Sequence, residues 1–445
     1  MPTDRFALRV TTNSAAALEA YDRAVDGLLG WDGATLDMFN QALEGDPDLA
    51  LAHAGAAVCH FLDERFPEAR AAVERARTAV ARATPRERGH VEAMVQLITG
   101  RPDQAERAMR EHLVNYPRDL AVVQRLYFIW FWQGRFPEML ALTTDLVRHY
   151  PRDSFMLGLH AFALEEANRL PEAFAAAEVA VARNPRDAWS VHALAHAVYE
   201  MGAARVGIAL LPPAIHPCTH LGWFRNHLVW HLALMHFACG DHERASRMAR
   251  AAFERRPSSI AGNLHDSISL LWRLMLCGMD VGERWGPFAA IARDRIHRQG
   301  LLFHAAHLAM ALAAAGDWPT AEQQLGMLRE RAPKDRTGLV GDVLIPLVQG
   351  LHAFVRADYR LAIETIEPLS PRVVALGGSR AQRDVFHDTL LEACFRAGDA
   401  DRAERLLAAR VARRPDAYWL SRRDSQRVNG RDPATMPPAL GLSAG

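Results

Sequence analysis

The sequence lacks a net charge, a disulfide pattern and a long apolar run. Its 52 basic and 52 acidic residues balance, so no overall field would attract nucleic acid or an anionic membrane surface. The five cysteines are an odd number without a CxxC pair, which favours a reducing compartment. The chain has no apolar signal core, and no window approaches the roughly 18 uncharged apolar residues of a membrane span. We therefore expect a cytoplasmic protein without nucleic-acid or membrane partners.

Motifs for several common reactions are missing as well. The sequence contains no HExxH motif, no phosphate-binding loop, no dinucleotide fingerprint and no serine or cysteine in a recognisable nucleophile elbow. An enzyme built on this chain is thereby limited to hydrolytic, isomerising or metal-assisted chemistry. The sequence favours no particular substrate for such chemistry.

A repeat of turn residues organises the 445-residue chain, half of which is hydrophobic. Ten glycine-like positions recur at spacings of 36, 34, 34, 34, 38, 38, 38, 41 and 41 residues. A period of 34 is that of tetratricopeptide helix pairs. The ten positions are Glu64, Gly100, Gly134, Asn168, Gly202, Gly240, Gly278, Gly316, Ala357 and Gly398.

Proline marks helix ends in the same phase. Pro117, Pro151 and Pro185 are 34 residues apart, and each is followed by Arg-Asp, so that the proline ends one helix and the aspartate can cap the next. No run shows sustained strand alternation. We predict an all-α fold, a right-handed α-solenoid of about ten divergent tetratricopeptide-like helix pairs, with about 22 helices in total.

The repeat phase carries through the proline-containing segments, so we predict one domain over residues 1–424. It would consist of N-terminal helices within 14–44 and helix pairs over 49–415. Residues 425–445 are polar and contain proline, and we expect them to form a surface-lying or disordered tail. Three segments inside the domain should be irregular, namely 211–222, 333–341 and 368–379.

Histidines fall mainly on the first helix of each predicted pair. In a helix-pair solenoid the first helices stack on one another and line the concave side. Of the 20 histidines, 14 map to first helices and four to second helices. The segment 185–202 illustrates the pattern, because Trp189, His192, His196 and Tyr199 are three or four residues apart and share one helix face. The distribution predicts a histidine-lined inner surface.

Some of these histidines have the spacing of metal ligands. Two imidazoles at i and i+4 can bind one divalent metal, with a third ligand from Glu200 or from a neighbouring first helix. Packed or hydrogen-bonded histidines are the alternative explanation, and the more frequent one. Metal binding by His192 and His196 is thus one hypothesis, and no cofactor is specified. The helically spaced pairs are His192 with His196, His227 with His231, and His304 with His307.

Two further polar groups lie on predicted first helices. Asp266 and Arg273 are seven residues apart and share a face, and an ion pair between turns of adjacent repeats would explain them. Ser379 with Gln382 fits a capping box. Gly377 and Gly378 before this helix, and arginines at 380 and 383 in its first turn, would also suit a carboxylate or phosphate, because basic residues there oppose the helix dipole.

Several segments resemble the signature segments of the tetratricopeptide repeat protein 38 family. This resemblance spans most of the chain and implies an intracellular α-solenoid of divergent repeats, without naming a reaction. The similar segments are Thr84–His90, Asp187–His196, Asn226–His231, Ser269–Leu274, Gly282–Trp285 and Gly377–Asp384.

The first functional hypothesis is an internal pocket that binds a small molecule or short peptide, with an anionic group on the ligand. The pocket would be formed by polar residues of successive first helices. The predicted ligand-binding residues are Trp189, His192, His196, Glu200, His227, His231, Asp266, Arg273, His304, His307, Ser379, Arg383 and Asp384.

Two other hypotheses use the same fold. An enzyme could use His192, His196 or His231 to carry a proton, with Asp266 to orient the imidazole and Arg383 to hold an anion. A scaffold that binds partner proteins is the ordinary use of such repeats, and it should present a broad apolar or uniformly charged groove. The oligomeric state is not specified by the sequence.

Overall fold

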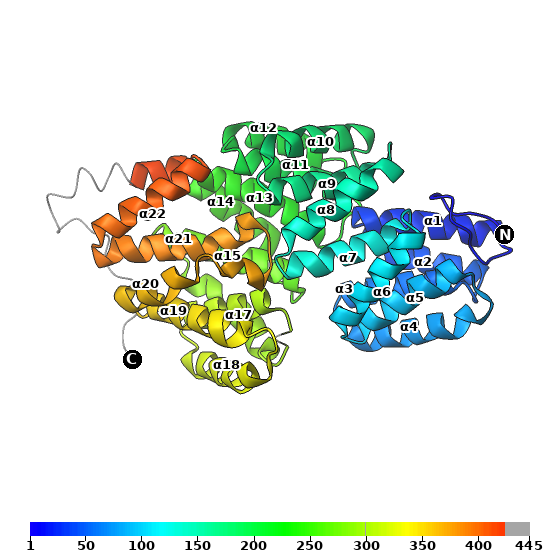
Figure 1. Ribbon diagram of the computed structural model, residues 1–445. Helices are drawn as coiled ribbons and strands as arrows, with labels where there is room; N and C mark the ends of the chain where they lie inside the picture. Colours follow the sequence, from blue (N-terminus) through cyan, green and yellow to red (C-terminus); the bar gives the residue numbers. More distant parts are fainter. Residues whose placement is uncertain (299, 423–445) are drawn as a thin grey trace. The chain divides into compact units, whose positions relative to one another are not determined.

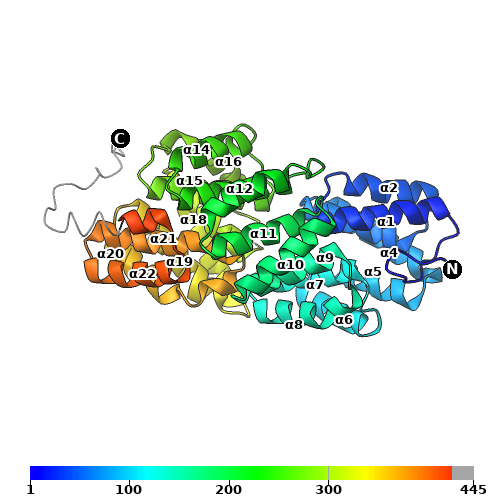
Figure 2. The same cartoon turned by 90° about the horizontal axis from the view of Figure 1, so that it is seen from above.

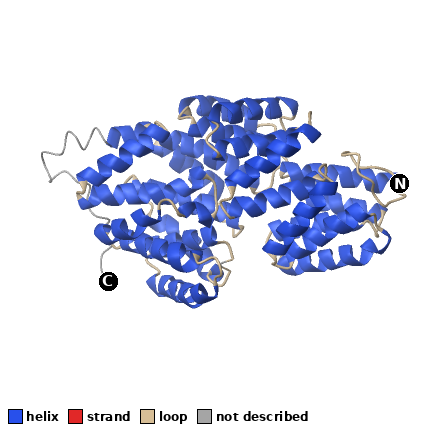
Figure 3. Ribbon diagram, viewed as in Figure 1, coloured by secondary structure: helices blue, strands red, loops and turns tan. Residues whose placement is uncertain are grey.

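A computed structural model describes residues 1–298 and 300–422 of the chain. Over these residues it contains 22 α-helices and no strand, only the isolated bridges Thr3–Arg9 and Asp32–Leu221 (Figure 3). The predicted all-α solenoid of helix pairs is confirmed, as is the predicted number of helices. The predicted tail, residues 425–445, lies outside the described residues. Within the described ranges, no helix combines the length and apolarity needed to cross a bilayer.

The helices follow one another as antiparallel pairs joined by short turns (Figure 1). Their bounds are α1 Ala15–Gly30, α2 Thr35–Gly45, α3 Ala50–Leu62, α4 Phe66–Ala79, α5 Pro85–Ile98, α6 Pro102–Asn115, α7 Leu120–Trp132, α8 Phe136–Leu146, α9 Ser154–Glu166, α10 Leu170–Arg183, α11 Ala188–Glu200, α12 Ala204–Ile215, α13 Phe224–Ala238, α14 His242–Ala249, α15 Ala261–Leu276, α16 Gly286–Arg295, α17 Leu302–Ala314, α18 Trp318–Arg331, α19 Ile345–Val355, α20 Tyr359–Ile366, α21 Arg380–Ala397 and α22 Ala400–Arg413.

All ten predicted turn positions adopt the left-handed backbone conformation. Their φ angles lie between 59° and 80°. A left-handed residue ends an α-helix and reverses the chain, and glycine adopts this conformation without steric cost. Glu64, Asn168 and Ala357 adopt it despite their β-carbons. The repeat phase in the sequence therefore locates every one of these turns.

The aspartates of the Pro-Arg-Asp motifs are well placed to cap helices. The Asp153 carboxylate accepts a hydrogen bond from the Met156 backbone N–H at 3.0 Å. Asp187 accepts from both the backbone N–H and the hydroxyl of Ser190, at 3.2 and 2.5 Å. These bonds satisfy amide groups at the start of α9 and α11.

One predicted irregular segment is partly helical. Residues 211–222 were expected outside the helices because of their prolines, but α12 continues through Pro212 and Pro213 to Ile215. The apolar face extends past the prolines, since Leu211 and Ile215 are 0 % and 6 % exposed. This burial compensates for hydrogen bonds that the prolines cannot donate. Residues 333–341 and 368–379 lie outside the α-helices, but they are not wholly irregular, because a turn of π-helix, Val340–Leu344, begins within the first and Val373–Leu376 is a turn of 3₁₀-helix within the second.

The packing of the helices divides the chain into two compact units. Unit 1 comprises residues 1–131, 135–197 and 212–225, and unit 2 comprises 132–134, 198–211 and the residues from Asn226 on. We describe each unit by itself. The single domain over 1–424 stays a prediction, because the contacts of a helical repeat are mostly between neighbours and two compact units do not decide between one domain and two.

Unit 1 is built from successive helix pairs. α1 packs on α2 (Figure 2), α3 on α4 and α5 on α6, and the first helix α3 also contacts α1 and α5. Gly55 of α3 allows one close contact, because a β-carbon there would lie 2.2 Å from the Phe39 ring of α2. The interior of this unit is consequently formed mainly by first helices.

First helices of unit 2 close into a group of four. α15 packs on α17, α17 on α19 and α19 on α21, and α21 in turn contacts α15. Trp272 Nε1 donates to Thr389 Oγ1 at 2.8 Å, and the Arg273 guanidinium donates to the Ala381 carbonyl at 2.8 Å. These partners are 117 and 108 residues apart in sequence. The curvature of the repeat thus brings polar residues of α15 beside those of α21.

The turn geometry predicts opposite effects for two alanine-to-glycine substitutions in unit 2. Ala357→Gly should stabilise the protein by about 1 kcal/mol, because alanine at φ 60° is strained and glycine is not. Ala408→Gly, at an exposed position inside α22, should destabilise it by about 1 kcal/mol. Urea unfolding monitored by circular dichroism measures both changes. Equal destabilisation by both substitutions would contradict the assigned turn.

Candidate functional site

All thirteen sequence-predicted ligand-binding residues are buried, each at most 8 % exposed. Trp189, His192 and His196 belong to unit 1, and the other ten belong to unit 2. The fourteen predicted first-helix histidines all lie on odd-numbered helices from α3 to α21, and ten of them are buried. The histidines therefore lie mainly on first helices, as predicted, and most of them are buried between the packed helices of each unit.

His227 and Asp266 form a buried hydrogen-bonded pair between α13 and α15. His227 Nδ1 lies 2.8 Å from Asp266 Oδ2. Burial raises the pKa of Asp266, while the neighbouring His227 and a hydrogen bond from Gln382 oppose the rise. His231, one turn further along α13, has its ring 4.9 Å from that of His227. A carboxylate that orients an imidazole in this way fixes which ring nitrogen is available to a ligand.

Three histidines of α15 and α17 form a second part of the cluster. Arg295 Nε donates to His304 Nε2 at 3.3 Å, so His304 carries its proton on Nδ1 and donates to His265 Nε2 at 2.9 Å. His307 Nδ1 faces the Phe303 carbonyl at 2.9 Å and must be its donor. Among the described residues, His265 Nδ1 and His307 Nε2 have no hydrogen-bond partner. The cluster thus holds one buried donor and one buried acceptor available to a ligand.

These three imidazoles are held in the neutral form. Burial lowers the pKa of His304 to about 3 and that of His307 to about 4. Burial, together with His304, His307 and Arg295, lowers the pKa of His265 well below its usual value. A neutral imidazole can donate and accept hydrogen bonds at once, which suits ligand recognition better than a cation would in this interior.

The start of α21 adjoins this cluster. Ser379 and Gln382 form the predicted capping box, with bonds of 3.3 and 2.9 Å. The Arg383 guanidinium donates to the Gly378 carbonyl. A β-carbon at Gly378 would lie 2.8 Å from the Phe303 ring, next to His307. Together with the Gln382 contact to Asp266, this geometry joins residues of α13, α15, α17 and α21, which we call the aspartate–histidine cluster. Its members are His227, His265, Asp266, His304, His307, Ser379, Gln382 and Arg383.

Three other predicted residues of unit 2, Glu200, Arg273 and Asp384, belong to an ion-pair network. Arg414 bridges Glu200, through Nη1 at 2.5 Å, and Asp384, through Nη2 at 2.6 Å. Asp388 lies 3.3 Å from Arg410 and 3.7 Å from Arg273. Burial raises the pKa of Asp384, but Arg410, Arg413 and Arg414 hold it well below its usual range. No local pattern in the sequence points to Arg410 or Arg414, because Arg414 and Glu200 are 214 residues apart.

In unit 1, His196 meets two glutamates that sequence reasoning missed. Glu165 and Glu166 of α9 and His196 of α11 each offer a ligand atom, and the three atoms lie within 4.8 Å of one another. His196 Nδ1 is 3.3 Å from Glu165 Oε2. The ring of His192 lies 4.5 Å from that of His196, and the ring of Trp189 packs on His192 at 4.6 Å. We call Glu165, Glu166, His192 and His196 the glutamate–histidine cluster. Carboxylate oxygens with imidazole nitrogen are a donor set for zinc, manganese or iron.

A second buried network of unit 1 uses the first Pro-Arg-Asp motif, residues 117–119. Asp119 accepts hydrogen bonds from Arg86 Nε at 2.8 Å and from His112 at 3.0 Å, and His90 lies 3.1 Å away. Arg86 also pairs with Asp4 at 3.1 Å. Burial raises the pKa of Asp119, but Arg86 and His90 hold it well below its usual value. Every charge in this network has a counter-charge, which is typical of a structural role.

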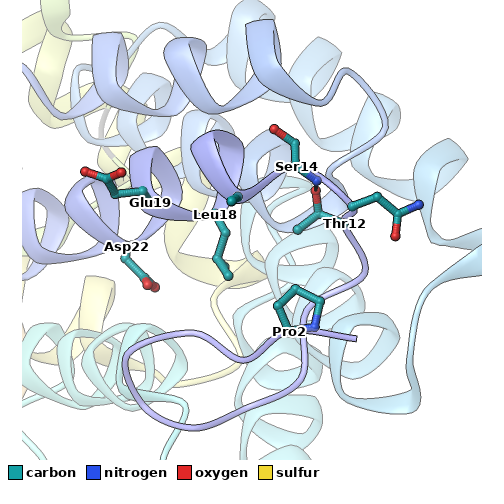
Figure 4. A pocket seen from close by; sticks show the side chains of 8 residues that line it. Pro2, Thr12, Ser14, Leu18, Glu19 and Asp22 are labelled. Carbon is teal, nitrogen blue, oxygen red and sulfur yellow. Dashed lines mark hydrogen bonds between the residues drawn. The ribbon is translucent and has the colours of Figure 1, made fainter.

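Two cavities of unit 1 do not involve the predicted residues. The larger, about 480 Å³, is a surface depression beside the start of α1, lined by residues such as Pro2, Thr12, Leu18 and Asp22 (Figure 4). The smaller lies inside the stack of first helices. None of the thirteen predicted residues lines either cavity.

Comparison with known proteins gives a similarity of fold. No protein-family model matches the chain. The human IFIT1 dimer with m7Gppp-AAAA is 14 % identical, with 96 % of this chain and 94 % of that chain covered and a TM-score of 0.43. Cut9 in the APC/C hetero-tetramer Cut9-Hcn1 is 13 % identical, with coverages of 86 % and 78 % and a TM-score of 0.40. Yeast Tom70 is 13 % identical, with coverages of 93 % and 88 % and a TM-score of 0.35. These are tetratricopeptide-type helical-repeat proteins.

The neutral histidines predict a dependence of stability on pH. Because His307 has a pKa of about 4 when folded and about 6.5 when unfolded, the unfolded chain binds its proton first as the pH falls. Stability should therefore decrease from about pH 6.5 towards pH 4. His307→Gln should reduce this slope by up to about 1.4 kcal/mol per pH unit. Urea unfolding at each pH measures the slope, and His216→Gln, in an exposed loop, is the control. Equal slopes for wild type and His307→Gln would contradict the assignment.

Proposed function

We propose that this chain is a tetratricopeptide-type binding protein whose aspartate–histidine cluster recognises a small anionic molecule or a short peptide. The contact between α15 and α21 carries the proposal, because it gathers His227, Asp266, His304 and Arg383 from four helices. Burying titratable groups costs free energy unless they are satisfied. A scaffold that only holds partner helices has no need of this many buried titratable groups.

The start of α21 supports an anionic ligand. Its first turn contains no acidic residue but includes arginines at 380 and 383, so the positive end of the helix dipole is reinforced. The Arg383 guanidinium, which donates to the Gly378 carbonyl, adds a positive charge that would attract a carboxylate or phosphate. Gly377 and Gly378, with φ of 89° and 80°, let the chain before this helix pack against the Trp132 carbonyl and the Phe303 ring. The unpartnered His265 Nδ1 and His307 Nε2 supply a donor and an acceptor for the rest of the molecule.

We also propose that the chain belongs to the tetratricopeptide repeat protein 38 family. Two of the similar segments support this assignment beyond the shared fold. Gly377–Asp384 contains Ser379, Gln382 and Arg383 of the aspartate–histidine cluster, and Asp187–His196 contains both histidines of the glutamate–histidine cluster. We further propose a cytoplasmic location, because the five cysteines form no disulfide bond, as is usual in a reducing compartment.

A second candidate function is metal binding by Glu165, Glu166 and His196, which would permit metal-assisted chemistry. One observation favours it: one ligand atom from each of these three residues lies within 4.8 Å of the other two. Metal–ligand bonds of about 2.0–2.2 Å in a tetrahedral site place neighbouring ligand atoms roughly 3.4 Å apart, so the three side chains would move closer together to hold one ion.

The ligand-binding proposal predicts the behaviour of two variants. A thermal-shift screen of carboxylates, phosphates and short peptides should yield a ligand for the wild-type protein. Arg383→Ala and His227→Ala should each weaken its binding about 10- to 100-fold, the loss expected for a charge-assisted hydrogen bond. Arg405→Ala, at an exposed position on α22, is the control. If both test variants bind the ligand as wild type does, the site is wrongly assigned and the scaffold hypothesis takes its place.

The metal proposal predicts retention of about one divalent ion per chain by purified protein. Glu165→Gln and Glu166→Gln should each lose the ion, because a neutral amide is a weaker ligand than a carboxylate. Glu172→Gln, exposed on α10, should retain it. Elemental analysis gives the occupancy. Absence of metal from the wild type, without a thermal shift on adding zinc, manganese or iron, would refute the proposal.

A further inference from the structure

A small cavity lies inside unit 1, where the first helices α1, α3, α5 and α7 meet. Its volume is about 10 Å³, room for one occupant of the size of a water molecule. The walls are mainly apolar and include Val25, Phe39, Leu51 and Met94. Arg125 of α7 is the one arginine or lysine among the lining residues. None of the candidate sites above includes this position.

Arg125 is a buried cation without a buried counter-charge. It is 4 % exposed and makes no ion pair with any described residue. Its guanidinium donates to the Gln124 side chain at 2.5 Å and lies 5.2 Å from the centre of the Phe128 ring. Within the described ranges, its Nε has no hydrogen-bond partner. An unpaired charge at this depth is strongly unfavourable.

Other groups around Arg125 do not neutralise it. Burial lowers the pKa of Arg125 to about 10, with the Cys59 thiol opposing, so the guanidinium remains charged at pH 7. Burial also raises the pKa of Cys59 to about 12, which keeps that thiol protonated. By contrast, buried Arg86 in the same unit pairs with both Asp4 and Asp119. Of these two buried arginines, only Arg125 lacks a negatively charged partner within the chain, so its positive charge requires an anion from solution.

We propose that this cavity binds a small monovalent anion of the halide class, held by the guanidinium of Arg125. The charge requires an anion, and the small volume favours a monatomic one over sulfate, phosphate or a carboxylate with an aliphatic chain. Chloride and bromide are larger than water, so the side chains that line the cavity would move outward slightly to admit them. The apolar walls strengthen the attraction between the two charges, because the local dielectric constant is low. A single water could accept the Nε hydrogen bond, but it would leave the charge unbalanced.

A crystal of the wild-type protein grown in bromide tests the site directly. Bromide should give an anomalous-scattering peak in the cavity, at about 3.2–3.5 Å from Arg125 Nε, somewhat longer than an N–H···O hydrogen bond. A water in the cavity, or an empty cavity with bromide bound elsewhere on the surface, would overturn the proposal. This experiment needs no variant and therefore does not depend on the folding of one.

Solution measurements test the role of Arg125. The melting temperature of the wild type should rise with chloride or bromide relative to gluconate or sulfate at equal ionic strength. Arg125→Gln should abolish the rise, whereas Arg75→Gln, exposed on α4, should retain it. Ala121→Val keeps Arg125 but fills the cavity, so it should abolish the rise as well, which covers the case in which Arg125→Gln does not fold. A halide response that persists in either test variant would contradict the proposal.

Discussion

The first helices of the repeat are covered by neighbouring helices, so a polar side chain on one of them is withdrawn from water. Burial of a polar group costs free energy unless it finds a partner, and the polar interior of this protein meets this constraint in three ways. His265, His304 and His307 give up their charge. Asp384 and Glu200 pair with Arg414. Arg125 does neither, which is why it points to an occupant that the chain does not supply. The same constraint turns polar residues on these helices into candidates for function.

The closed group of α15, α17, α19 and α21 converts this constraint into a candidate site. An extended stack of helix pairs would leave Asp266 and Arg383 on separate repeats. Because α21 returns to α15, the capping box of α21 instead lies beside the His227–Asp266 pair. Recognition of an anion would then use a helix start that already carries arginine, next to imidazoles that are neutral at physiological pH. In this account, curvature of the repeat determines which residues can act together.

The sequence predicts the local features of the fold well, since each depends on residues close together in the chain. The ten turns need a left-handed residue at a fixed phase, and the Ser379 capping box needs two residues three apart. It predicts less of the candidate site. Asp119, Asp153 and Asp187 share one motif, and Asp153 and Asp187 cap helices. Asp119 instead accepts a hydrogen bond from Arg86 and lies beside two histidines of other segments. Glu165 and Glu166 near His196, or Arg414 beside Glu200, follow from the accumulated rotation of several repeats, which no local pattern encodes.

The central claim is that helix packing holds the buried first-helix imidazoles neutral and so prepares them for hydrogen bonding to a ligand. Nuclear magnetic resonance of the ring nitrogens of His265, His304 and His307, followed between pH 8 and about pH 5, tests it most directly, because the shifts distinguish neutral tautomers from imidazolium. The account predicts that all three remain neutral at about pH 5, with the proton of His307 on Nδ1 and that of His304 on Nδ1. Titration of these rings near the ordinary value of about 6.5 in the folded protein would contradict it.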